Sequence, residues 1–245
     1  MVIRTGCLSL FLLLAARSAT GMGAERGAAH QVVRQVWTFT ALLLDAFAIT
    51  AQTLIGYFVG MDSVGTARNV ARVVTQWSLG VGVALTLAML AGQSLIESWL
   101  VPSEAVAVFG AAWWLSAVFQ PLNALCFITD GIHWGTADYR FLRNAMLLAT
   151  VVGVLGIWFL WLLLTTRFPQ VGEDAPFHLI TWSQFLGVTG GNLVLLVCLA
   201  TDGYHCRLSP PGLRRGHLLG ITLAIAALAV VQWGVVYAYG PIQVS

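Results

Sequence analysis

Charged side chains are scarce in this sequence. Of its 245 residues, 9% are charged and 58% are hydrophobic, and the mean hydropathy is +0.83. A soluble domain needs about 25% charged residues to cover its surface. This chain falls far short of that share, so its solvent must be largely lipid. The composition therefore predicts a polytopic membrane protein.

Other features are missing, and each absence excludes a class of function. Lysine is absent, all twelve basic residues are arginines, and the net charge of +2 is too small to indicate a nucleic-acid partner. The four cysteines form no C-x-x-C pair and no histidine has another His or a Cys at the helical spacing of three or four residues, so neither metal nor haem is predicted. No Walker A loop, G-x-S-x-G or H-E-x-x-H motif occurs. We therefore expect no enzymatic activity and no cofactor, and any transport should draw on an ion gradient.

Long apolar runs are what the sequence does contain. A window of about 19 residues finds seven segments, each long enough for a helix to cross the hydrocarbon core, so the predicted fold class is all-α. Their approximate limits are 3–22, 33–59, 73–100, 105–128, 142–165, 178–200 and 217–239. The first segment also fits a cleaved signal peptide, because Arg4 precedes an apolar run that ends in Ser18 and Ala19.

The arginines indicate an orientation. Cytoplasmic loops of membrane proteins carry an excess of Lys and Arg. If the N-terminus is inside, eight arginines fall on the cytoplasmic side and four on the outer side. We therefore predict a cytoplasmic N-terminus.

Asp45 and Gln52 are the first candidate site residues. They are seven positions apart in the segment 33–59, so they lie on nearly the same face of a helix. A carboxylate in an apolar span favours protonation or pairing with a cation, because burial disfavours its charge. Asp45 therefore either binds a coupling H⁺ or Na⁺, or is a structural acid that pairs with Arg34 or bonds to a neighbouring helix.

Gln120, Pro121 and Asn123 form the second candidate group. Pro121 has no N–H and frees a carbonyl one turn earlier, near Ala117 or Val118. Broken helices often line the pathway of membrane transporters, and the two amides would then face that pathway. Alternatively, Pro121 only kinks a packed helix, and Gln120 and Asn123 satisfy the exposed backbone.

A polar, Gly-broken stretch, residues 130–140, follows directly. We predict a cytoplasmic loop there, with Asp130 and Asp138 as helix caps. Several phrases of the sequence together resemble the second half of a multidrug and toxic compound extrusion (MATE) transporter, and within that family the DNA-damage-inducible protein F (DinF)-like branch. The phrases are residues 28–31, 44–52, 68–72, 120–123 and 130–131.

The resemblance implies a fold and favours a membrane span, rather than a signal peptide, for 3–22. Residues 1–200 would form a six-helix transmembrane lobe, with the resemblance strongest over 1–165. A cytoplasmic loop, 201–216, would lead to a probable extra seventh transmembrane helix and a short tail, 217–245.

The resemblance also implies a function, namely export of organic or cationic compounds across the plasma membrane in exchange for H⁺ or Na⁺. Asp45 would bind the coupling cation or the substrate charge, and Pro121 would permit bending. Gln52, Gln120 and Asn123 would line the path. Because only the second lobe is matched, the chain would act as a half-transporter, in a homodimer or with a separate first lobe. The alternative is a non-transporting membrane subunit, or truncated gene product, that packs against a partner lobe.

Overall fold

The computed structural model describes residues 2–140, 142–144, 146–147, 150–151 and 154, and these ranges contain helices and turns but no strand. The all-α class is thereby confirmed. The predicted segments 178–200 and 217–239 and the loop 201–216 lie outside the described residues, as does most of 142–165. The elements are α1 (Val2–Gly21), α2 (Ala24–Gly60), α3 (Val64–Ala91), α4 (Gln93–Leu100), the 3₁₀ turn η1 (Ser103–Ala105), α5 (Val106–Val118) and α6 (Gln120–Gly135).

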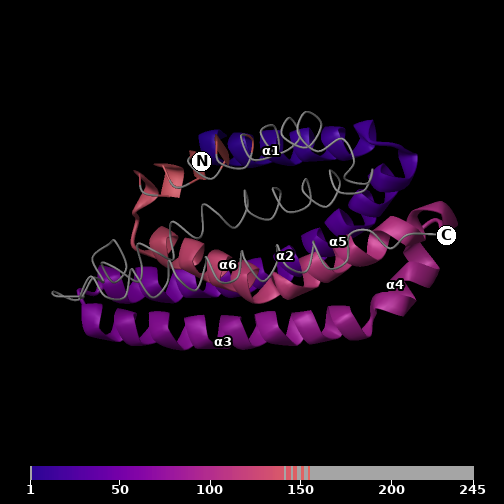
Figure 1. The fold of residues 1–245 in the computed structure, drawn as a ribbon. Coiled ribbons are helices and arrows are strands. Elements are labelled where there is room, and N and C mark those ends of the chain that lie inside the picture. The colour runs from indigo at the N-terminus through magenta and orange to yellow at the C-terminus, as the bar shows by residue number, and fades with distance from the viewer. Residues whose placement is uncertain (1, 141, 145, 148–149, 152–153, 155–245) are drawn as a thin grey trace, which may run out of the picture.

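Helix α2 is the centre of the described part. It packs against α1, α3, α5 and α6 (Figure 1). Helices α2 and α3 are each long and apolar enough to cross a membrane, and the bent pair α5–α6 passes the same test of length and composition when its two helices are taken together. The predicted spans 33–59, 73–100 and 105–128 fall on these elements, with different boundaries. The predicted span 73–100 extends too far toward the C-terminus, because α3 ends at Ala91. The chain bends at Gly92, and a separate helix, α4, begins after it.

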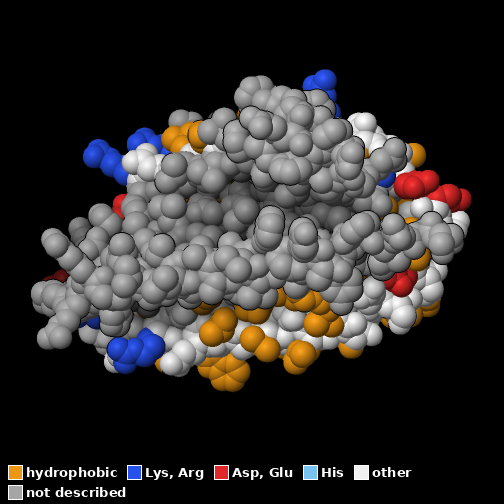
Figure 2. Space-filling model, in the orientation of Figure 1, with side chains coloured by type: hydrophobic (Ala, Val, Ile, Leu, Met, Phe, Trp, Pro, Cys, Tyr) orange, Lys and Arg blue, Asp and Glu red, His pale blue; other side chains and the backbone are white. Residues whose placement is uncertain are grey.

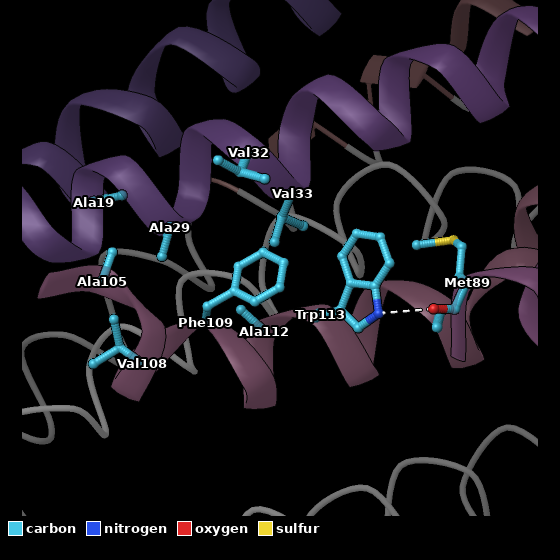
Figure 3. Packing of buried hydrophobic residues seen from close by; sticks show 11 residues of the cluster. Ala19, Ala29, Val32, Val33, Met89, Ala105, Val108, Phe109, Ala112 and Trp113 are labelled. Carbon is cyan, nitrogen blue, oxygen red and sulfur yellow. Dashed lines mark hydrogen bonds between the residues drawn. The ribbon is translucent and has the colours of Figure 1, made fainter. Parts of the chain in front are cut away.

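Two clusters of buried apolar residues hold the helices together. In the first, Phe109 and Trp113 of α5 pack against Val33 of α2 (Figure 3). The Trp113 indole Nε1 also donates a hydrogen bond to Met89 O at 3.0 Å, which ties α5 to the end of α3. The second cluster joins α2, α3 and α6 and consists of Ala51, Ile55, Ala67, Ala71, Ile128 and Ile132.

The loop predicted at 130–140 is wrong in its first half, because α6 continues to Gly135 and Asp130 lies inside it. The two glycines serve helix contact instead. A Cβ on Gly131 would collide with the backbone of Ala48 in α2, and one on Gly135 would lie 2.7 Å from Gln52 O. Small residues at four-residue spacing allow such close approach of two helices. Gly131 faces Ala48 and Gly135 faces Gln52, so residue numbers increase in the same direction along both helices. Helices α2 and α6 therefore run parallel.

Both helices end in the same way. Asp62 follows α2 and Ala137 follows α6 with positive φ angles of 58° and 62°. The next N–H in each turn donates to the carbonyl five residues earlier, Ser63 to Phe58 O and Asp138 to His133 O. These bonds define Schellman turns, in which a left-handed residue terminates the helix. Asp138 then begins the following helical turn, where its carbonyl accepts the Leu142 N–H.

The surface suits a lipid environment. Large apolar side chains of α3 point outward, with Trp77 69% and Leu87 63% exposed. Figure 2 shows hydrophobic side chains along the α3 edge of the molecule, arginines near the end where α2 and α6 terminate, and acidic groups at the α4 end. Apolar flanks between charged ends are what a bilayer requires.

Candidate functional site

The break between α5 and α6 is the most unusual feature of the described residues. The helix axes of Ala112–Val118 and Gln120–Gly135 differ by 48°. Pro121 lies in the first turn of α6 and cannot donate a backbone hydrogen bond to Ala117 O, four residues earlier. That carbonyl instead accepts a hydrogen bond from the Thr86 hydroxyl of α3 at 2.8 Å. The carbonyl predicted to be freed therefore has a partner from another helix.

Helix α3 holds the other arm of the break by close contact. The Ser78 hydroxyl donates to Ala124 O of α6 at 3.0 Å. One turn further along α3, a Cβ on Gly82 would lie only 2.7 Å from Pro121 Cα. Because real Cβ atoms do not approach other atoms so closely, a glycine is required for α3 to reach the break.

Gln120 and Asn123 are fully buried at the start of α6, at 0% and 1% exposure. Gln120 Nε2 makes a long bond of 3.3 Å to Ser116 O. Gln120 Oε1 and both amide atoms of Asn123 have no hydrogen-bond partner in the described part of the chain. Burying a polar atom without a partner costs several kcal/mol in hydrocarbon, and such atoms mark functional sites.

Ser116 belongs to the same group, and the sequence interpretation missed it. Its Oγ is buried and has no partner among the described residues. Ser116 precedes Gln120 by four residues and Asn123 by seven, so helical spacing alone could have indicated it. The group offers neutral oxygens and an amide N–H₂, which suit a hard cation, water or a polar substrate group. Within the described ranges, no cluster of three His, Cys, Asp or Glu side chains forms a metal site.

Asp45 and Gln52 lie elsewhere, on the exposed side of α2. Asp45 makes no ion pair with Arg34 in the described part of the chain, and Arg34 is half-buried. Its surroundings are apolar, since the neighbours on α2 at 66% and 55% exposure are Leu42 and Ile49. The predicted site residues thus form two groups, an exposed pair on α2 and a buried pair at the α5–α6 break.

Comparison with known proteins identifies the family of this chain. The family model MatE matches residues 2–159, which is more than half of the chain. The chain belongs to the MatE family. It is therefore a helical membrane protein of that family, as the resemblance implied.

The curated relatives to which the chain is similar include two Arabidopsis thaliana proteins. It is 29% identical to Protein DETOXIFICATION 44, chloroplastic, over 171 residues, covering 64% of this chain and 33% of the relative. It is 29% identical to Protein DETOXIFICATION 42 over 160 residues, covering 64% of this chain and 30% of the relative. The chain thus spans about a third of the length of the curated relatives it matches.

A solved structure shares the fold. It is a MOP superfamily transporter from Pyrococcus furiosus, with a TM-score of 0.70 and 18% sequence identity. The match covers 95% of this chain and 50% of the solved chain. At this identity the likeness shows the fold alone.

Proposed function

We propose that this chain is one lobe of a MATE-type secondary transporter that exports organic or cationic compounds in exchange for H⁺ or Na⁺. The observation that carries the proposal is the buried polar group Ser116, Gln120 and Asn123 at a helix break, in a chain of the MatE family. Discontinuous helices whose polar groups face a cavity are how membrane transporters bind ions and substrates near the bilayer midplane.

The two groups of candidate residues have different roles in this proposal. Asp45 carries the charge that binds the coupling cation or the cationic substrate, and Gln52 extends that exposed face of α2. Gln120 and Asn123 line the path with neutral oxygens, and Pro121 permits the bend. A carboxylate in an apolar environment attracts a cation or proton because its charge is poorly solvated.

The family branch, the membrane and the orientation of the chain are proposed as well. We infer that the chain is similar to the DinF-like branch, that it resides in a plasma membrane and that its N-terminus is cytoplasmic. Four arginines, Arg68, Arg72, Arg140 and Arg143, support the orientation, because they follow or flank the ends of α2 and α6 on one side of the bundle. The chain acts as a half-transporter, as a homodimer or beside a separate first lobe.

The test is efflux of a fluorescent cationic dye from cells that lack their own exporters and express this chain. We expect dye loss that collapses with the ion gradient and with Asp45→Asn. The matched control is Asp62→Asn, since Asp62 is an exposed carboxylate in the turn after α2 and Asn tolerates its positive φ. Unchanged efflux in the Asp45→Asn variant, with equal membrane insertion, contradicts the role of Asp45.

The second candidate is a non-transporting subunit that packs against a partner lobe. The exposed side of α2, with Asp45 among apolar residues, favours such a partner surface. This alternative predicts no dye efflux from the chain alone and full tolerance of Asp45→Asn. It also predicts that the chain accumulates only when the partner is co-expressed.

A further inference from the structure

The Thr86 hydroxyl lies between two carbonyls. Its Oγ1 is 2.8 Å from Ala117 O of α5 and 3.2 Å from Gly82 O of its own helix. A hydroxyl has a single hydrogen to donate, so the two acceptors share it or take it in turn. The shorter distance shows that Ala117 O is the main acceptor when α5 and α6 are bent as observed.

Ala117 O needs this donor for a specific reason. In an unbroken helix the N–H of residue 121 would donate to it, but residue 121 is proline. The Phe119 N–H that reaches toward Ala117 O is shared with Leu115 O. Thr86 therefore supplies, from a helix 31 positions away in sequence, the hydrogen bond that Pro121 removes.

Three residues of α3 at four-residue spacing contact the break. Ser78 bonds to Ala124 O on the α6 side, and Gly82 lies against Pro121 at the centre. Thr86 bonds to the α5 side. One face of a single helix thus holds both arms of the bend, and only the Thr86 contact has an alternative acceptor within α3 itself.

We propose that Thr86 is a positioning residue whose hydroxyl acts as a releasable bond for the α5–α6 break, an inference that rests on the proposed transport function. When α5 moves away from α3, the hydrogen passes to Gly82 O and the hydroxyl stays satisfied. When α5 returns, Ala117 O regains its donor. The bend angle therefore changes without leaving the Thr86 donor unpaired, and Gln120 and Asn123 in the first turn of α6 are reoriented with it.

The experiment is a double-mutant cycle between Thr86→Val and Pro121→Ala, measured by hydrogen exchange of the full chain in lipid nanodiscs. Thr86→Val keeps the side-chain shape and removes the donor. We expect amides in residues 115–124 to exchange about tenfold faster, the order of change that loss of one buried hydrogen bond produces. In the Pro121→Ala background the same substitution should have no effect, because the new N–H donates to Ala117 O.

Two further variants make the result decisive. Thr86→Ser keeps the hydroxyl and should restore wild-type exchange. Thr75→Val is the control, because Thr75 is also half-buried on α3 and its hydroxyl bonds only within the helix, to Ala71 O at 2.7 Å. An equal increase for Thr86→Val in both backgrounds, or no increase in either, overturns the proposal. Hydrogen exchange does not measure transport, so failure of this proposal can be distinguished from failure of the dye-efflux test.

Discussion

At the scale of single residues, buried polar side chains near the α5–α6 break fall into two kinds, those with a hydrogen-bond partner and those without one. Ser78 and Thr86 each bond to a backbone carbonyl of another helix, whereas the Asn123 amide is buried without such a partner in the described part of the chain. A satisfied hydroxyl stabilises the fold, and an orphaned amide destabilises it. Within the described residues the orphaned Asn123 amide therefore fits the role that the proposed function gives it, a polar group that binds a ligand.

This difference predicts that two substitutions change the free energy of unfolding in opposite directions. Asn123→Leu replaces two orphaned polar atoms by methyl groups in the same branched arrangement and should raise the stability of the fold by about 1–3 kcal/mol while it abolishes dye efflux. Ser78→Ala removes a satisfied bond and should lower stability by about 1 kcal/mol. Thermal unfolding in detergent gives both values. If Asn123→Leu destabilises the chain, the amide is a structural hydrogen-bonding group and not part of a site.

The sequence indicated part of this site and not the rest. Pro121 is visible in the sequence, and its freed carbonyl follows from backbone geometry alone, so the position of the break was predictable. The donor was not predictable, because Thr86 meets Ala117 O only through packing of α3 against α5. Asp45 and Gln52 share a face of α2, as their spacing indicates. Their distance from Gln120 and Asn123 depends on how α2 packs against α6, and the spacing of residues within one helix does not determine that packing.

At the scale of elements, the contact between α2 and α6 shows why a helix was predicted as a loop. Glycines such as Gly131 and Gly135 favour a turn in a polar stretch of sequence, yet both lie inside α6 where the backbone of α2 leaves no room for a side chain. The residue that ends α6 in the left-handed conformation is Ala137, which carries no sequence signal for that role. Sequence periodicity cannot distinguish a glycine that ends a helix from a glycine that lets a second helix approach closely.

Gly131→Ala tests the helix contact. The new Cβ would meet the Ala48 backbone, so the two helices must separate, and we expect a loss of about 1–3 kcal/mol in unfolding free energy. Gly80→Ala is the matched control, because Gly80 is also inside a helix but no atom lies within 4 Å of its added Cβ. That variant should gain about 0.5–1 kcal/mol from reduced chain entropy. Equal effects of the two substitutions on thermal unfolding would show that α2 and α6 do not touch at Gly131.

At the scale of the whole molecule, the chain matches half of a solved transporter and carries an exposed face on α2. Asp45 on that face makes no hydrogen bond or ion pair within the described ranges. A lipid-facing carboxylate is costly, and a second lobe placed against α2 would give it polar surroundings. Two copies related by an axis along the membrane normal would produce that arrangement, because parallel repeats in transporters have this symmetry.

Co-expression of the wild-type chain with the Asp45→Asn variant tests the homodimer. If both copies must supply Asp45, equal expression leaves about a quarter of the dimers fully wild type, and dye efflux should fall to roughly that fraction. If each chain works alone or with a separate first lobe, efflux should fall only to about half. The Asp62→Asn chain in the same mixture keeps total expression constant and should leave efflux unchanged. A decrease to a quarter with Asp45→Asn alone therefore assigns the paired α2 faces to the transport path, and a decrease to half contradicts a homodimer that needs Asp45 from both copies.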